Sequence, residues 1–308
     1  MLRVFQTTII KPLSFNGIGL HSGRNSRVKI LPGVEDTGII FKRVDLKNNN
    51  LIKANYANVS SAKLCTTLEN NHGIKVATVE HLLAALYIAD IDNAIIEIDS
   101  DEVPIMDGSA REFLKLLKKA GLINQKKKRK YLKIINRIKL KDGKREILIE
   151  PNNSCLEVNF HLDYENKIIG KQENTVNFHK DKLEDVFNSR TFCLYEDIEK
   201  IKKIGLAKGG SLENAIVVND DRILNDSGLR NDKEFVNHKI LDLAGDFLLS
   251  GYRILGKVTC HQGGHELTNL FLRKMLRENS SFQAIELEDI FVSNQVKLQR
   301  PHKLAVNA

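Results

Sequence analysis

Two side chains in the segment 234–246 are spaced so that they could hold one metal ion. His238 and Asp242 are four residues apart within a predicted helix, so both project from one helical face, one turn apart. A histidine nitrogen and a carboxylate oxygen can bind the same ion at about 2.0–2.2 Å. A hydrogen-bonded surface pair is the alternative, and spacing alone does not decide between them. Asp246 extends the same polar stripe by another turn.

A Glu-His pair stands at the start of a second, otherwise apolar helix, expected over residues 79–89 with Thr78 as its N-cap. Burying Glu80 and His81 there is unfavourable unless they have partners or a ligand. His81 could bind zinc, while Glu80 just outside the ligand shell could act as a general base. The helix dipole alone would account for Glu80 but not for His81.

Two further segments could complete this chemistry. His265 follows Gly263-Gly264 between a predicted strand end and a helix start, where glycines allow the backbone to approach a ligand closely. It could protonate a leaving group, or it could be a turn histidine without a role. The tetrapeptide 189–192 carries the hydroxyl of Thr191, which could help to bind a developing oxyanion. By itself this tetrapeptide decides nothing.

These residues must be positioned by elements that alternate between sheet and helix. Strands are expected over 7–15, 26–31, 37–44, 93–98, 133–140, 145–151, 155–162, 214–218 and 253–260. Helices are expected over 79–89, 109–120, 183–187, 196–204, 232–251 and 266–278. The simplest architecture is α+β, with two domains that are each a β-sheet layer with helices packed on it.

The most basic segment of the 308-residue chain is the expected domain boundary. We expect an N-terminal domain over 1–125, a basic linker over 126–131 and a C-terminal domain over 132–308. The run Lys126–Lys130 is typical of a solvated linker, and a phosphate- or membrane-facing patch is the alternative. Inside the second domain, an insertion at about 193–222 has its own small structure, as functional lids and binding elements often do.

Composition and charge limit the function classes. Apolar residues make up 42% and charged residues 28%, as in ordinary globular proteins. No window approaches the roughly 18 apolar residues of a membrane span, and residues 1–10 do not resemble a signal peptide, so we expect a cytoplasmic protein. The four cysteines are widely separated, which favours free thiols over a Cys₄ zinc site.

The net charge of +8 indicates a phosphate-bearing partner: a nucleotide, a nucleic acid or an anionic lipid surface. The chain has no Trp and its aromatic residues are scattered, so a stacking platform for single strands is not expected. A basic binding protein without catalysis is an alternative to a metal hydrolase. A zinc peptidase is disfavoured because no HExxH motif is present.

Short motifs in a fixed order extend along nearly the whole chain. They lie at residues 17–23 (GIGLHSG), 65–68 (CTTL), 78–86 (TVEHLLAAL), 104–109 (PIMDGS), 189–192 (SRTF), 209–211 (GGS), 229–230 (LR), 238–246 (HKILDLAGD) and 264–265 (GH). Together they resemble the UDP-3-O-acyl-N-acetylglucosamine deacetylase family, zinc hydrolases of early lipid A (lipopolysaccharide) biosynthesis in Gram-negative bacteria.

The resemblance implies hydrolysis of the N-acetyl group of UDP-3-O-(3-hydroxyacyl)-N-acetylglucosamine at a zinc ion with one open coordination position. Glu80 would be the general base, and His265, held by Asp246, would protonate the departing amine. Thr191 would help to stabilise the oxyanion, and Lys239 would add positive charge. The implied metal ligands are His81, His238 and Asp242, a set that could also hold iron.

The resemblance also implies an active site at the interface of the two domains and an apolar passage in the insertion for the acyl chain. Phe160 and His161 resemble contacts on the uracil side of the substrate. Gln262 stands where many relatives have a basic residue, and His261 is a candidate substitute. We expect a monomer without a nucleic-acid partner and with at most transient membrane-surface contact. Phe192 is a further candidate for substrate binding. The candidates for the passage, which could instead pack the core of the insertion, are Leu194, Ile198, Leu212, Ile216 and Val217.

Overall fold

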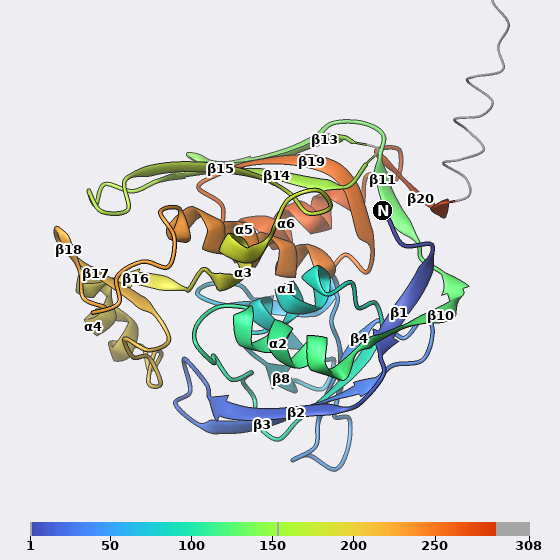
Figure 1. Ribbon diagram of the computed structural model, residues 1–308, viewed down its shortest axis with the longest axis horizontal. Helices are drawn as coiled ribbons and strands as arrows, with labels where there is room; N and C mark the ends of the chain where they lie inside the picture. The colour runs from blue at the N-terminus through green and yellow to red at the C-terminus, as the bar shows by residue number, and fades with distance from the viewer. Residues whose placement is uncertain (1, 153, 288–308) are drawn as a thin grey trace, which may run out of the picture.

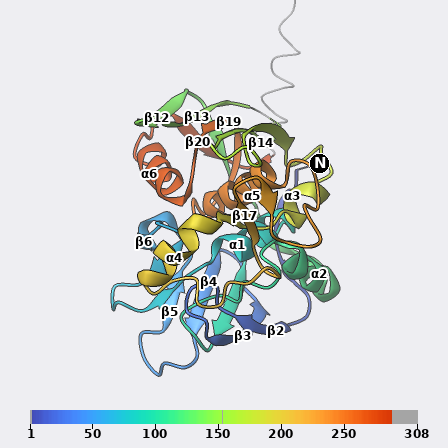
Figure 2. The ribbon, with the colours of Figure 1, turned by 90° about the vertical axis from the view of Figure 1, so that its left-hand side faces the viewer.

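Two β-sheets form the outer layers of the protein, and most of its helices lie between them (Figure 1). The same layers are visible after a quarter turn (Figure 2). This computed structural model describes residues 2–152 and 154–287. Its mixed composition of sheets and helices confirms the predicted α+β class. The division into domains at residues 126–131 stays a prediction.

The sheet of the first half has five strands in the order β2-β3-β9-β4-β5. Buried and exposed residues alternate along β3, so that Val28 and Ile30 point into the core, as expected of a sheet with one solvated face. Helices α1 (Glu80–Ile88) and α2 (Arg111–Ala120) lie on the inner side of this sheet (Figure 1). The strands are Leu13–Ile18 (β2), Asn25–Pro32 (β3), Ile39–Arg43 (β4), Leu51–Lys53 (β5) and Ala94–Ile98 (β9).

The sheet of the second half has seven strands, with β12-β13-β19-β11-β20 in order and β14 paired with both β19 and β15. Three helices lie on its inner side: α3 (Glu184–Asn188), α5 (Glu234–Leu248) and α6 (His265–Met275) (Figure 1). The strands are Tyr131–Ile134 (β11), Ile138–Asp142 (β12), Arg145–Pro151 (β13), Leu156–Asp163 (β14), Lys171–Asn177 (β15), Arg253–His261 (β19) and Phe282–Ile285 (β20).

The two halves meet where α1 packs against α5. Gly245 of α5 faces the start of α1, and a Cβ atom at this position would lie 2.2 Å from the carbonyl oxygen of Glu80. Only glycine permits so close an approach without a backbone shift. The crossing therefore brings the first turn of α1 next to the middle of α5.

Three small sheets complete the fold. The insertion consists of one of them, β16-β17-β18, together with α4 (Tyr195–Lys203), and Figure 1 shows it beside the helical layer. A 3₁₀ helix spans Tyr56–Asn58. The strands of the small sheets are Phe5–Ile9 (β1), Leu122–Lys128 (β10), Val59–Ser61 (β6), Thr67–Glu69 (β7), Lys75–Val76 (β8), Phe192–Leu194 (β16), Ile216–Asn219 (β17) and Arg222–Ile223 (β18).

The basic segment at residues 126–131 differs from the solvated linker that we predicted. Its first three residues belong to β10, which pairs antiparallel with β1. Arg129 is buried and makes ion pairs with Asp90 at 2.9 Å and with Asp92 at 2.7 Å. Two carboxylates therefore compensate the burial of this guanidinium. Lys126, Lys127 and Lys130 are exposed, as expected.

Several predicted boundaries were also wrong. The strand predicted over 7–15 is divided between β1 and β2, and the strand predicted over 133–140 is divided where Ile135 and Asn136 donate hydrogen bonds to Ser281 outside the ladder. Thr78 is not the N-cap of α1, since that position is Val79. The Thr78 hydroxyl instead donates to Glu102 at 2.8 Å. Within the described residues, no helix is both long and apolar enough to cross a membrane.

Candidate active site

His81, His238 and Asp242 converge at the crossing of α1 and α5. Asp242 Oδ1 lies 3.5 Å from His81 Nε2 and 3.3 Å from His238 Nε2. One potential ligand atom from each residue lies within 4.8 Å of those of the other two, and all three residues are buried. The predicted proximity of three side chains from two distant segments is therefore present.

The spacing of these atoms fits a divalent metal ion. Tetrahedral coordination with bonds of 2.0–2.1 Å separates ligand atoms by about 3.3–3.4 Å, close to the two distances from Asp242. The oxygen Asp242 Oδ1 is buried without a hydrogen-bond partner among the described residues. A buried carboxylate oxygen without a donor is unfavourable, and a cation between it and the imidazoles would satisfy it.

The orientation of the His238 ring is fixed by a contact on the side away from Asp242. Its Nδ1 lies 3.1 Å from the carbonyl oxygen of Ser189, so that Nε2 is left to face Asp242. The adjacent Arg190 is held by Glu234, which accepts from its backbone nitrogen at 3.0 Å and from its Nε at 2.8 Å. Glu234 is fully buried, and Arg190 is 3% exposed. This ion pair ties the Ser189 carbonyl to the first turn of α5.

Glu80 and His265 face one another across the site, and Thr66 orients both sides. The backbone nitrogen of Thr66 donates to Glu80 Oε2 at 3.0 Å, and its hydroxyl donates to Asp246 Oδ1 at 2.7 Å. The other oxygen of Asp246 lies 2.8 Å from His265 Nδ1. His265 Nε2 therefore points into the site, 3.8 Å from Glu80 Oε1.

Burial and nearby charges give His238 and His265 very different pKa values. Burial lowers the pKa of His238 to about 3, although Asp242 acts in the opposite direction. Burial would also lower the pKa of His265, but Asp246 and Glu80 overcome it and raise the pKa to about 10. Burial raises the pKa of Glu80 above its usual value. His238 is thus neutral, as a metal ligand must be, and His265 carries a proton.

Lys239 adds a positive charge beside the site. Its Nζ lies 3.0 Å from Asp242 Oδ2 and 5.4 Å from the centre of the Phe192 ring. Burial acts to lower the pKa of Lys239, but Asp242 outweighs it and raises the pKa above its usual value. Burial acts to raise the pKa of Asp242, but His238 and Lys239 hold it well below the usual range. This carboxylate is therefore ionised.

A cavity of about 340 Å³ opens onto these groups, and a second, largely apolar cavity of about 360 Å³ lies next to it. Thr191 and Phe192 line both cavities. The second cavity is built mainly by the insertion. Among the predicted acyl contacts, Ile198, Leu212 and Val217 line this apolar cavity, and Leu194 lines the polar one.

The family model of UDP-3-O-acyl N-acetylglycosamine deacetylase (LpxC) matches residues 6–277. Curated proteins from Shewanella oneidensis and Shewanella baltica, both named UDP-3-O-acyl-N-acetylglucosamine deacetylase, are each 39% identical over 288 residues, which cover 92% of this chain and 94% of the relative. The chain belongs to this deacetylase family. The predicted family resemblance is thereby confirmed.

Not every residue predicted for this member of the deacetylase family lies at the cavities. Phe160 is buried at 2% exposure, with its ring against Gly263, and Ile216 is fully buried; neither lines either cavity. His161 stacks on His261, with ring centres 4.1 Å apart. Gln262 hydrogen-bonds to the backbone of Asp163. The uracil-side contacts therefore stay predictions.

Sequence reasoning missed three residues that position the candidate catalytic groups of this deacetylase-family chain. Thr66, Arg190 and Glu234 bond to catalytic candidates or to the segment beside them. Thr66 and Arg190 lay inside matched motifs, but no role followed from their residue types. Glu234 is an acidic residue in the first turn of a helix, a position that the helix dipole already favours. Only the three-dimensional contacts single it out.

Proposed function

We propose that the chain hydrolyses the N-acetyl group of UDP-3-O-(3-hydroxyacyl)-N-acetylglucosamine, giving UDP-3-O-acyl-glucosamine and acetate in early lipid A biosynthesis. The observation that carries the proposal is the triangle of His81, His238 and Asp242 beside the facing pair Glu80 and His265. Membership of the deacetylase family supports the choice of substrate.

His81, His238 and Asp242 would hold one Zn²⁺ ion. When bound, such an ion lowers the pKa of water and polarises a carbonyl group. The chemistry of the donor set suits this role, because two neutral imidazoles and one carboxylate form a common catalytic zinc site. Iron binds the same donor types, so metal analysis must accompany the activity assay.

Glu80 would take the proton from the water that attacks the acetamide carbonyl. Its Oε2 is held by the backbone nitrogen of Thr66, which leaves Oε1 facing the site. A proton acceptor in such a position contributes about 10²–10⁴-fold to the rate. The raised pKa of Glu80 makes the carboxylate a stronger base than one in water.

His265 would return a proton to the nitrogen as the C–N bond breaks. Asp246 accepts from its Nδ1, so that Nε2 carries the proton that can be transferred. Lys239 and the hydroxyl of Thr191 line the same cavity and would stabilise the oxyanion that forms at the carbonyl. The acyl chain would occupy the apolar cavity of the insertion.

The proposal is tested by metal removal and a product assay on the purified protein. Treatment with a chelator should abolish the release of acetate from the UDP-sugar, and one equivalent of Zn²⁺ should restore it. Elemental analysis should find about one metal ion per chain, as expected of a single three-ligand site. Full turnover in a protein freed of metal would refute the proposal, and so would an unreacted UDP-sugar with the metal-loaded protein.

A further inference from the structure

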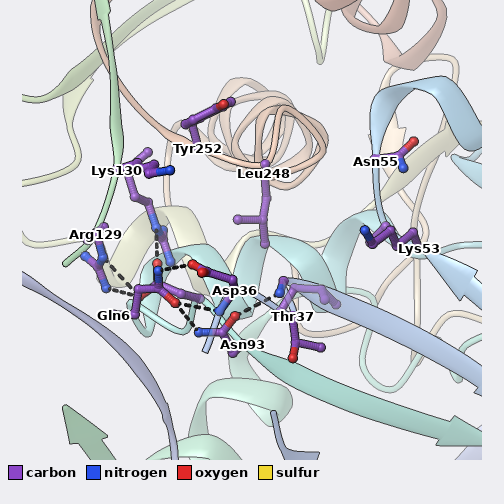
Figure 3. A pocket seen from close by; sticks show the side chains of 16 residues that line it. Gln6, Asp36, Thr37, Lys53, Asn55, Asn93, Arg129, Lys130, Leu248 and Tyr252 are labelled. Carbon is purple, nitrogen blue, oxygen red and sulfur yellow. Dashed lines mark hydrogen bonds and ion pairs between the residues drawn. The ribbon is translucent and has the colours of Figure 1, made fainter. Parts of the chain in front are cut away.

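A polar cavity of about 420 Å³ lies between the two halves, at the C-terminal end of α5 (Figure 3). Leu248, the last residue of α5, lines it. The first half contributes Thr37, Lys53 and Asn55, and the later part of the chain contributes Lys130 and Tyr252. Its volume is within the range of small-molecule sites, about 300–1,000 Å³.

The carboxylates of this cavity already have partners. Asp36 accepts from Gln6 at 2.7 Å and also pairs with Lys127. Asp92 pairs with Arg129 at 2.7 Å and accepts from the backbone nitrogen of Thr7 at 2.7 Å. These acidic groups therefore offer little further capacity to bind a cation or a hydrogen-bond donor.

The polar groups without partners are all able to donate. Within residues 2–152 and 154–287, no hydrogen bond or ion pair involves the amino groups of Lys53 and Lys130, the hydroxyls of Thr37 and Tyr252, or the side-chain nitrogen of Asn55. The charge of Lys130 acts on Asp36 without an ion pair, as one of the causes that lower the pKa of that carboxyl. In Figure 3, Lys53 and Lys130 approach the cavity from opposite sides, with Tyr252 above and Thr37 below. A ligand that satisfies these groups must be rich in acceptors.

The net charge of the walls selects an anion. Of the four cationic side chains in the lining, Arg129 is paired with Asp90 and Asp92, and Arg253 lies 3.7 Å from Asp92. The ammonium groups of Lys53 and Lys130 remain as positive charge at the walls. Lysine ammonium and hydroxyl donors arranged around one space are suited to phosphate oxygens. We propose that this cavity binds a small phosphate-bearing anion that bridges the two halves of the protein.

A soluble phosphate compound fits the cavity better than a lipid headgroup. The apolar residues of its walls are Ile39, Ala54 and Leu248, and none of them is an exposed side chain. Nothing in the lining would therefore insert into a bilayer beside a bound headgroup. A soluble anion needs only the donors at the mouth and walls.

The test is titration calorimetry of the full-length, metal-loaded protein with inorganic pyrophosphate, with metal content measured before and after. The double variant Lys53→Ala/Lys130→Ala should weaken binding at least about tenfold, because it removes two charge-assisted contacts. Lys118→Ala/Lys119→Ala removes the same charge from exposed positions of α2 outside the cavity and should leave binding within about twofold. Tyr252→Phe should weaken binding by a smaller factor.

Two controls separate this cavity from the catalytic one and from membranes. Lys63 and Arg145 line the catalytic cavity, so pyrophosphate bound there would depend on them. Binding that is lost in Lys63→Ala/Arg145→Ala and kept in Lys53→Ala/Lys130→Ala would overturn the proposal. The proposal would also be overturned if Lys53→Ala/Lys130→Ala and Lys118→Ala/Lys119→Ala weakened pyrophosphate binding equally. A third contradicting result would be binding to phosphatidylglycerol vesicles that depends on Lys53 and Lys130, together with no heat of binding for pyrophosphate. No readout uses deacetylation, so the outcome is independent of the proposed function.

Discussion

The site has two sides with opposite electrostatic character, and one buried histidine marks each. His238, on the metal side, contacts a backbone carbonyl and lies 3.3 Å from the carboxylate of Asp242, which Lys239 also engages. His265, on the proton-transfer side, contacts Asp246 and faces Glu80. Burial lowers the pKa of the first to about 3, while the carboxylates raise that of the second to about 10.

The difference shows that burial alone does not set the role of a histidine. Desolvation favours the neutral imidazole at both positions. At His265 two nearby carboxylates reverse this preference, whereas at His238 the charge of Asp242 is partly offset by Lys239 and His81. A neutral imidazole can bind a metal, and a charged one can donate a proton. The carboxylate environment therefore supports the two roles proposed for these histidines.

Alanine variants of His238 and His265 should differ in metal content. His238→Ala should remove a metal ligand and reduce both metal content and acetate release to background. His265→Ala should retain about one metal ion per chain and lose roughly 10²–10⁴-fold in kcat, the usual contribution of a general acid. Elemental analysis and the deacetylation assay measure both effects. Equal metal loss in the two variants would erase the distinction between the sides.

Glu80→Gln examines the base on the proton-transfer side. The amide preserves the size of the side chain but cannot accept the proton from water, so kcat should fall by about 10²–10⁴-fold. Metal content should be unchanged, because Glu80 is not among the three clustered ligand candidates. Full turnover of the purified variant would show that another group is the base.

Asp246→Asn should make His265 more similar to His238. Loss of this carboxylate removes the largest influence that raises the pKa of His265. A lower pKa means that His265 loses its proton at lower pH, so the alkaline limb of the kcat profile should move to lower pH. The rate near pH 6 should fall less than the rate near pH 9. An alkaline limb that stays in place would indicate that it reports another group.

Glu234→Gln should weaken metal binding without removing a metal ligand. It weakens the buried ion pair with Arg190, and thereby the position of the Ser189 carbonyl that orients His238. Zinc affinity, measured by competition with a chelator, should drop by about tenfold, as for other changes behind a metal ligand. Glu184→Gln, at an exposed position of α3, is the matched control and should leave affinity unchanged. Equal affinity in both variants would rule out this positioning role.

The smallest expected effect concerns the acyl cavity. Val217 lines this cavity and is 6% exposed. Val217→Phe should narrow the cavity, raising KM for substrates with long acyl chains more than for short ones. Zinc affinity should not change. A uniform change for all chain lengths would mean that the acyl chain binds elsewhere.

The sequence predicted the parts of the site that depend on local spacing. The interval between His238 and Asp242 requires one helical face, and α5 supplies it. The motif order was sufficient to associate His81 with them, although nothing in the spacing shows that α1 crosses α5. That crossing depends on Gly245, whose missing side chain has no periodic pattern of its own.

The sequence did not predict the paired structure of the basic segment or the short strands of the first half. Five lysines and arginines in succession indicate solvent exposure, yet β10 pairs with β1 and Arg129 is buried between Asp90 and Asp92. These carboxylates are 37 to 39 residues away in the sequence. The short strands β5 to β8 have only two or three residues each, too few for an alternating pattern.

Thr66 gives the proton-transfer side a shared anchor. Its backbone bonds to Glu80 and its hydroxyl to Asp246, so any displacement of this one residue moves the acceptor and the support of the donor together. The two proposed proton transfers would therefore be mechanically linked even though their side chains come from different helices. Selection for one catalytic step would constrain the other through the same threonine.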